Sequence, residues 1–204
     1  MARLFLVRHG ETELQSSMRY WGKTDVALGE VGRHQAEKLR DRLASEKIDL
    51  VYSSPLKRAS DTAGIIASKH NLKVTLCPEL REIDFGKIEG LEFSEIHRHF
   101  PEVEQLWINR SPGLTYPGGE SLMQLEDRVS AFKPRLAAHE EEDTILIVAH
   151  YGVLRTLICQ MLEVEMKNRW NIKLDLASLS IIETYPEVNI LCLLNDISHL
   201  KEGA

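Results

Sequence analysis

The chain has 204 residues, of which 43% are hydrophobic and 27% charged, a composition typical of a folded protein with a substantial core. This length favours a single domain that covers residues 1–204. The formal net charge of -6 argues against a protein that binds nucleic acid regardless of sequence, because such proteins need a basic surface.

The start of the chain and its cysteines limit where the protein works. No apolar run approaches the roughly 18 residues that span a bilayer, and Arg3 comes too early for a secretory signal. We therefore expect a cytoplasmic protein without a membrane segment. Cys77, Cys159 and Cys192 lie far apart with no C-x-x-C pair, so we expect neither a disulfide framework nor a thiolate zinc site.

Strands and helices are predicted to alternate along the chain. Short apolar or β-branched runs at residues 4–7, 50–52, 74–76 and 145–149 are typical of strands buried on both faces. Between them, apolar or small residues recur at helical spacing. They are Gly32, Ala36, Leu39 and Leu43 in the first helix, and Leu122, Leu125, Val129, Phe132 and Leu136 in a later one.

The end of the chain predicts an antiparallel edge. Residues 179–184 and 189–194 flank the turn sequence Tyr-Pro-Glu-Val, which indicates two antiparallel strands. Prolines and glycines interrupt residues 91–117, which we interpret as a partly helical cap insert within the single domain. The expected fold class is α/β: a three-layer sandwich with a mainly parallel central sheet flanked by helices and one antiparallel edge strand.

The first strand leads directly into Arg8-His9-Gly10-Glu11-Thr12. A cation, an imidazole, a glycine and a hydroxyl therefore lie together at the carboxyl end of a parallel strand, where open α/β sheets bind ligands. Arginine can form a bidentate pair with phosphate oxygens, and glycine lets the backbone approach them. Taken alone, a histidine after a strand is as easily a structural residue.

The second strand leads into Ser53-Ser54-Pro55-Leu56-Lys57-Arg58. Ser54 fits a helix N-cap and Pro55 the first helical residue, which places Arg58 in the first turn, where the helix dipole favours anions. In isolation, the simpler interpretation is an arginine in solvent.

The fourth predicted strand ends in His150-Tyr151-Gly152, before an apolar helical run over residues 153–162. Three strand-to-helix junctions thus each supply a group that can bind phosphate. Three coincidences are far less expected than one, so the combination favours a phosphate site made of Arg8, His9, Arg58 and His150.

A phosphoryl-transfer enzyme also needs an acid for the leaving alkoxide. Residues 80–86 contain two candidates, Glu82 and Asp84. Glu82 has apolar neighbours that help a carboxylic acid to keep its proton, and it is the preferred candidate. Spacing alone does not separate the two.

Other phosphate chemistries do not fit the sequence. Cys77 lacks the arginine six positions later that a C-x5-R phosphatase loop needs, and Gly86-Lys87 lacks the earlier glycine of a Walker A loop. His97 and His99 are two residues apart and would lie on different faces of a helix. We therefore expect no catalytic metal and no cofactor.

Five segments together resemble the histidine phosphatase superfamily, also called the phosphoglycerate mutase-like family. They are residues 6–12 (Leu-Val-Arg-His-Gly-Glu-Thr), 52–59 (Tyr-Ser-Ser-Pro-Leu-Lys-Arg-Ala), 80–86 (Leu-Arg-Glu-Ile-Asp-Phe-Gly), 117–121 (Pro-Gly-Gly-Glu-Ser) and 148–152 (Val-Ala-His-Tyr-Gly). The resemblance implies that His9 is the phosphorylated nucleophile and Glu82 the proton donor, with Arg8, Arg58 and His150 completing the phosphate pocket. It also implies a three-layer α/β fold with the insert beside the pocket mouth.

Within the superfamily, the chain resembles the phosphatase branch more than the longer mutases. It is most similar to α-ribazole-5'-phosphate phosphatases of cobalamin assembly and also resembles small phosphoserine phosphatases. A phosphatase that acts on phosphoserine or on a sugar phosphate is therefore an alternative. A mutase that returns the phosphoryl group to its product is an alternative enzyme. An inactive module that binds a phosphorylated metabolite is an alternative from another class.

Three positions depart from the family pattern and bear on substrate binding: Gln15, Lys23 and Tyr151. We expect a small-molecule phosphate ester as the partner, and a second copy of the chain is the one protein partner considered. His199 is a further candidate for specificity. The expected substrate contacts are Arg8, Thr12, Gln15, Gly22, Lys23, Arg58, Glu82, His150, Tyr151 and Gly152.

Overall fold

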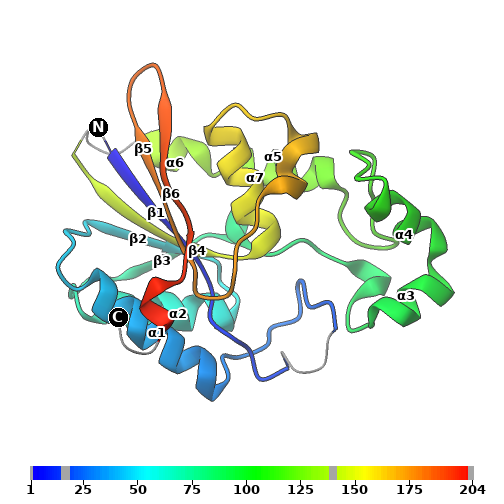
Figure 1. Ribbon diagram of the computed structural model, residues 1–204, viewed down its shortest axis with the longest axis horizontal. Coiled ribbons are helices and arrows are strands. Elements are labelled where there is room, and N and C mark those ends of the chain that lie inside the picture. The colour runs from blue at the N-terminus through cyan, green and yellow to red at the C-terminus, as the bar shows by residue number, and fades with distance from the viewer. Residues whose placement is uncertain (1, 15–18, 138–141, 202–204) are drawn as a thin grey trace.

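The computed structural model describes residues 2–14, 19–137 and 142–201, which form a six-stranded sheet with helices on both faces (Figure 1). The strand order is β3-β2-β4-β1-β5-β6. The strands are β1 (Ala2–Arg8), β2 (Leu50–Ser53), β3 (Val74–Leu76), β4 (Thr144–Ala149), β5 (Leu179–Thr184) and β6 (Asn189–Asp196). The first four pair in parallel, and β5 pairs antiparallel with both β1 and β6. The predicted mainly parallel sheet with an antiparallel edge pair is confirmed.

The α-helices occupy the two outer layers and one lateral segment. They are α1 (Glu30–Leu43), α2 (Lys57–Ser68), α3 (Phe93–His99), α4 (Pro101–Ile108), α5 (Leu122–Ser130), α6 (Lys133–Ala137) and α7 (Tyr151–Met161). Short 3₁₀ turns are η2 (Pro78–Leu80), η3 (Gly86–Ile88), η4 (Met166–Asn171) and η5 (Ser198–Leu200).

Alternation along β1 divides the core between the two faces of the sheet. Leu4 and Leu6 pack into the cluster that includes α5 and α7, whereas Phe5 and Val7 pack into the cluster with α1 and α2. Successive side chains of a strand point to opposite faces, so each strand contributes to both layers. β4 is buried at all six positions, as expected for a central parallel strand.

The prediction that residues 74–76 are buried on both faces is wrong. β3 is the outer strand beside β2, and both Thr75 and Leu76 are exposed. An edge strand has a neighbour on one side only, and its three residues are too few for helices to cover completely. The apolar run predicted the strand but not its place in the sheet.

Two helix boundaries also differ from expectation. α2 begins at Lys57 with Leu56 as its N-cap, so the assignment of Ser54 as N-cap and Pro55 as first helical residue is wrong. The helix expected to run through Leu136 divides into α5 and α6, because Pro134 has no N–H for an interior helical hydrogen bond.

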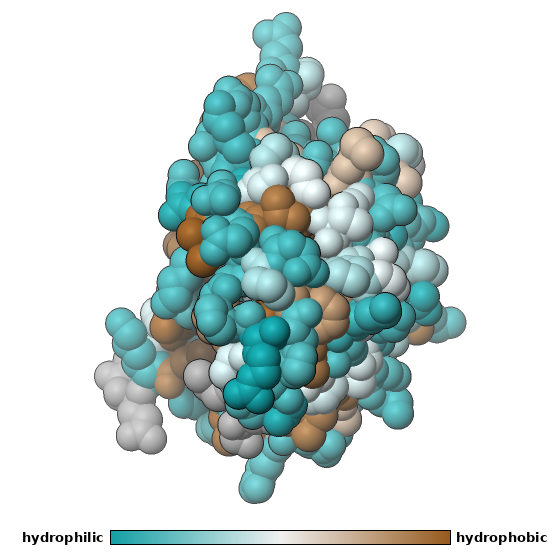
Figure 2. Space-filling view, turned by 90° about the vertical axis from the view of Figure 1, so that its right-hand side faces the viewer, coloured by the Kyte–Doolittle hydropathy of each residue, from teal (hydrophilic) through white to brown (hydrophobic). Residues whose placement is uncertain are grey.

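Residues 91–117 contain α3 and α4, which lie to one side of the sheet (Figure 1). Figure 2 turns this side toward the viewer, and hydrophilic residues cover most of the visible face. Among the described residues, no helix combines the length and apolar character needed to cross a membrane.

Candidate active site

The strand-to-helix junctions meet because β2, β4 and β1 are neighbours in the sheet and run in parallel. The His9 amide donates to Ala149 O at 3.1 Å, and the Ser54 amide donates to Val148 O at 3.0 Å. Backbone hydrogen bonds to β4 thus continue into both junctions. This brings the side chains of His9, Arg58 and His150 to one edge of the sheet, as the sequence predicts.

His9 is buried, and its ring is held in one tautomer. Nδ1 lies 2.7 Å from Gly10 O and donates to it, which leaves the Nε2 lone pair free. Burial is the largest effect on the ring, followed by the guanidiniums of Arg58 and Arg8, and all three lower its pKa well below the usual range. His9 is therefore a neutral imidazole with a nucleophilic nitrogen.

His150 lies beside His9 with both ring nitrogens hydrogen-bonded. The ring centroids are 5.1 Å apart. Nδ1 of His150 accepts from Arg58 Nε at 3.2 Å, so the proton is on Nε2, which donates to Ser54 Oγ at 2.8 Å. Burial and the nearby Arg58 lower the pKa of His150 well below the usual range. The two imidazoles are thus neutral beside fixed cations.

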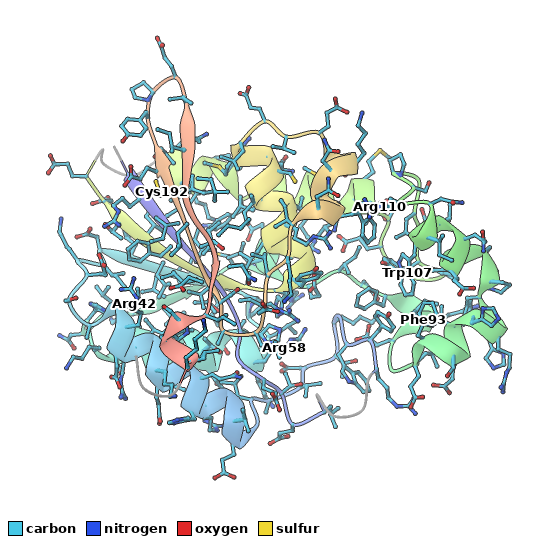
Figure 3. All side chains as sticks on the ribbon, viewed as in Figure 1. Arg42, Arg58, Phe93, Trp107, Arg110 and Cys192 are labelled. Atoms are coloured by element: carbon cyan, nitrogen blue, oxygen red, sulfur yellow. The ribbon has the colours of Figure 1, made fainter. Side chains whose placement is uncertain are left out.

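Backbone carbonyls hold the guanidinium of Arg58, a residue labelled in Figure 3. Nη1 donates to Thr24 O at 2.8 Å and Nη2 donates to Gly22 O at 2.6 Å, while Nε contacts His150. Burial lowers the pKa of Arg58, and the Glu82 carboxylate opposes this effect. Arginine nevertheless stays charged in proteins, so Arg58 supplies a buried positive charge for phosphate.

Arg8 is the second fixed cation. Its Nη1 donates to Leu174 O at 2.6 Å, and its guanidinium carbon lies 4.9 Å from the centre of the Tyr151 ring. Nε of Arg8 is buried and has no hydrogen-bond partner among the described residues. This unpaired donor is available to a phosphate oxygen. The Tyr151 ring, for its part, stabilises the Arg8 guanidinium through a cation–π contact.

The two candidate acids, Glu82 and Asp84, have different hydrogen-bond and ion-pair partners in the structure. Lys23 Nζ forms an ion pair with Asp84 Oδ2 at 2.9 Å, and the other oxygen of Asp84 accepts from the Gly86 amide at 2.8 Å. Glu82 is buried, and its two oxygens accept only backbone hydrogen bonds, from Ile83 N at 3.0 Å and Gly152 N at 3.1 Å. No cation among the described residues forms an ion pair with Glu82, and this difference favours Glu82 over Asp84.

Gly152 is required by this arrangement. A Cβ at this position would lie 2.6 Å from Glu82 Oε1, which is too close for any side chain. Its small size therefore lets the carboxylate reach the amide at the start of α7. The structure places Gly152 as a residue that positions the candidate acid.

Glu82 lines two cavities. One, of about 620 Å³, also contains polar residues such as Lys23, Asp84 and Arg128. The other, of about 310 Å³, extends toward Tyr151, α4 and η4. Because Glu82 lines both cavities, its carboxyl group is placed to contact the leaving group of a substrate bound there.

The remaining candidates are two predicted substrate contacts, Thr12 and Gln15, and the specificity candidate His199. Thr12 is buried and pairs with Leu28 through the backbone, and no hydrogen bond of the described residues joins it to His9 or Arg58. Gln15 lies outside the described residues. His199 Nε2 donates to Ala177 O, 3.0 Å away, and His199 lies beside Arg42 of α1, away from the cavities that Glu82 lines.

The structure gives Gly10 a packing role that the sequence interpretation did not include. Its amide donates to Thr62 Oγ1 at 3.2 Å, and a Cβ would lie 2.5 Å from Gly32 O. Gly10 thus allows β1 to pack against α1, and its amide is occupied within the fold. The glycine pair at positions 10 and 32 supports the loop that carries His9.

Sequence reasoning missed four residues that shape the site. Ser54 was expected to cap a helix but contacts His150, and Thr62 holds the loop after His9. Arg155 and Arg169 line the smaller cavity. Arg155 lies in the apolar run 153–162. A charged residue within such a run was the one feature of the sequence that could have indicated a functional role. Among residues 2–14, 19–137 and 142–201, no group of three His, Cys, Asp or Glu side chains could hold a metal ion.

Comparison with known proteins agrees with this geometry. Residues 4–197 match the family described as "Histidine phosphatase superfamily (branch 1)". The chain is 35% identical to phosphoserine phosphatase 1 of Hydrogenobacter thermophilus, over 99% of this chain and 96% of that protein. A putative α-ribazole-5'-P phosphatase structure from Escherichia coli superposes with a TM-score of 0.89 and 31% identity, covering 96% of each chain.

A third relative was solved with a ligand. It is a phosphoserine phosphatase mutant from Entamoeba histolytica in complex with phosphoserine, with a TM-score of 0.87 and 28% identity, covering 98% of this chain and 100% of that one.

Proposed function

The chain belongs to the histidine phosphatase superfamily and is a phosphomonoester hydrolase, and from this premise we propose that the reaction proceeds through phosphorylation of His9 at Nε2. One observation carries the proposal. The hydrogen bond from Nδ1 to Gly10 O leaves Nε2 as the free nitrogen, and the guanidiniums of Arg58 and Arg8 act on the ring and lower its pKa. A neutral imidazole held in this way can attack phosphorus directly.

In the first step, Nε2 of His9 forms a bond to phosphorus while the bond from phosphorus to the ester oxygen breaks. Arg8 and Arg58 stabilise the charge on the phosphoryl oxygens, which is the main catalytic contribution that a protein can make to phosphoryl transfer, and His150 positions Arg58 through the hydrogen bond that it accepts from Arg58 Nε. Glu82 gives its proton to the departing oxygen. A water molecule then loses a proton to the Glu82 carboxylate and attacks phosphorus, which releases inorganic phosphate and restores both residues.

Two substrates named in the relatives, α-ribazole phosphate and phosphoserine, are candidates for this chain. Both are small-molecule phosphomonoesters, in line with the size of the cavities at Glu82. We assign to residues 91–117 the role of a cap that contacts the leaving group, since Trp107 of α4 lines the smaller cavity. The single domain, the cytoplasmic location and the second copy as partner stay predictions.

The test measures two products from the same reaction. The purified protein is incubated with a panel of phosphomonoesters that includes α-ribazole 5'-phosphate, phosphoserine and 3-phosphoglycerate. We expect stoichiometric inorganic phosphate and free alcohol. Formation of 2-phosphoglycerate without phosphate release would instead identify a mutase, and no turnover of any ester would favour the binding module.

A further inference from the structure

The smaller cavity beside Glu82, here called the aromatic pocket, has walls from segments far apart in sequence. Its lining residues are Tyr20, Glu82, Ile83, Phe85, Trp107, Tyr116, Leu122, Tyr151, Gly152, Arg155, Arg169 and Trp170. Tyr20 stacks at 5.0 Å from Trp107, and Phe85 meets Tyr116 edge-on at 4.9 Å. Trp107 Nε1 donates to the Tyr116 hydroxyl at 2.9 Å, which fixes this wall (Figure 3).

Two buried arginines stand in this largely apolar wall. Arg155 and Arg169 are each only 4% exposed. Nε of Arg155 donates to Arg169 O at 2.6 Å, so α7 and η4 are joined through a backbone carbonyl. The Arg155 guanidinium carbon lies 5.2 Å from the centre of the Trp170 ring, and that of Arg169 lies 5.7 Å from it.

Arg169 lacks the partners that a buried guanidinium needs. Its Nε and Nη1 are buried without any hydrogen-bond partner among the described residues, and no ion pair joins Arg169 to a described carboxylate. Glu82, Glu126 and the Tyr116 hydroxyl act on its charge only from a distance. A buried, unpaired arginine is costly because it cannot lose its proton. Its free donors therefore point to an anion that the protein itself does not supply.

The aromatic pocket is close enough to the phosphate site for one small substrate to reach both. The guanidinium carbons of Arg8 and Arg155 lie 4.9 and 4.6 Å from the centre of the same Tyr151 ring. They are thus no farther apart than the sum of these two distances. Glu82, the acid assigned to the leaving oxygen, lines the pocket together with Arg155, and its charge acts on Arg8.

We propose that Arg155 and Arg169 bind a second anionic group, a carboxylate or a phosphate, carried by the leaving group of the substrate. This inference rests on the proposed function, because it assumes that the leaving group occupies the pocket beside Glu82. The substrate class is then a small phosphomonoester with an anion on its alcohol part. The guanidinium group of arginine can form bidentate hydrogen bonds with either a carboxylate or a phosphate. Kinetic comparison of matched substrates must therefore show which of the two anions is bound.

Two matched substrate pairs test the inference on the wild-type protein. The carboxylate pair is 3-phosphoglycerate and glycerol 3-phosphate, and the phosphate pair is 1,3-propanediol bisphosphate and its monophosphate. In one of the two pairs, we expect kcat/KM to be roughly 10- to 100-fold higher for the substrate whose alcohol part carries the second anion. This is the usual effect of hydrogen bonds to a charged group. Ratios below about threefold in both pairs would overturn the inference.

Arg169→Met then removes the donors but keeps a long side chain, and the carbonyl that holds Arg155 remains. The substitution should lower kcat/KM for the preferred anionic substrate by roughly 10- to 100-fold and leave its neutral partner within about threefold. The matched control is Arg33→Met, which removes an exposed arginine from α1 and should change neither value. Equal losses on both members of the pair would contradict the assignment.

Two further measurements keep the outcome decisive. If Arg169→Met does not fold, as judged by circular dichroism, Arg155→Met is tested with the same pair and the same expectation. Calorimetric titration of His9→Ala with both members measures binding without turnover. A missing binding preference in His9→Ala overturns the anion subsite. A preserved binding preference, together with a wild-type protein that hydrolyses neither ester, overturns the proposed function alone.

Discussion

The phosphate site and the aromatic pocket share one boundary, Glu82, but they are built in different ways. Arg8, His9, Arg58 and His150 follow strands that are neighbours in the sheet, so backbone pairing places them. The aromatic pocket is assembled from the cap segment, the loop before α1, α7 and η4. Its side chains are placed by tertiary packing, with no common backbone frame.

We infer from this difference that the phosphate site carries out the chemical step and that the aromatic pocket determines which substrates are accepted. Every phosphomonoester presents the same phosphoryl group, so a rigid site at the sheet edge serves any member of the class. Leaving groups differ, and the pocket that meets them is made of loops and turns, which tolerate sequence change. Substitutions in the phosphate site should therefore affect all substrates alike, and substitutions in the aromatic pocket only some.

The largest effect is expected from His9→Ala. Removal of the nucleophile should lower kcat for every ester by about four orders of magnitude or more, because no other group can form the covalent intermediate. Steady-state phosphate release measures the loss, and circular dichroism checks the fold. A variant that keeps wild-type turnover would break the assignment of this site.

Glu82→Gln tests the boundary between the two regions. Hydrolysis of an alkyl phosphate should fall by roughly two to four orders of magnitude, the usual reach of general acid catalysis. The first step with an activated aryl phosphate should suffer less, because its phenolate leaves without a proton. Rapid-mixing measurements should show a burst of phenol and then slow phosphate release.

Asp84→Asn is the matched control for the acid, since Asp84 is paired with Lys23. If the dependence on the leaving group appears in Asp84→Asn instead, the proton donor is Asp84.

Ser54→Ala should have a smaller and uniform effect. The Ser54 hydroxyl accepts from His150 Nε2 and thereby fixes the tautomer that faces Arg58. Its loss should lower kcat/KM by about tenfold for every substrate, in line with a lost buried hydrogen bond. Ser60→Ala on the exposed side of α2 is the control. A loss confined to one substrate would place Ser54 in leaving-group recognition.

The smallest effect concerns stability. Burial and neighbouring guanidiniums lower the pKa of His9 and His150 in the fold, whereas in the unfolded chain both take up protons near pH 6.5. The unfolded state thus binds more protons as pH falls from about 7 to 5. The free energy of unfolding should decrease by up to about 1.4 kcal/mol per pH unit for each histidine.

Urea unfolding at several pH values measures this slope. His9→Ala should show a shallower slope than the wild type, because one of the two histidines is gone. His34→Ala, which removes a surface histidine, is the control. Identical slopes for wild type and His9→Ala would contradict the neutral state assigned to His9.

The convergence of Arg8, His9, Arg58 and His150 at one sheet edge could be predicted from sequence, because apolar runs indicate strands and parallel strands end at one edge. The same logic does not reach Arg155 or Arg169, whose partners are Tyr151, Trp170 and a backbone carbonyl of η4. Those contacts depend on how the elements pack after the sheet has formed.

Ser54 shows the same limit within the phosphate site. Local sequence rules favour it as a helix cap, but its hydroxyl accepts from His150, 96 positions away in the chain, and α2 starts later. A tertiary hydrogen bond thus overrides a local preference. Lys23 likewise pairs with Asp84 across 61 positions, and this contact favours Glu82 as the acid, a choice that spacing left open.

The central claim is that the phosphoryl group passes through His9, and trapping the intermediate tests it most directly. Glu82→Gln is mixed with an activated aryl phosphate, quenched in base, digested and analysed by peptide mass spectrometry, because phosphohistidine survives base. We predict a near-stoichiometric phosphoryl group on His9 that decays as phosphate is released. A phosphoryl group on another residue, or a phenol burst without any phosphorylated peptide, would contradict the account.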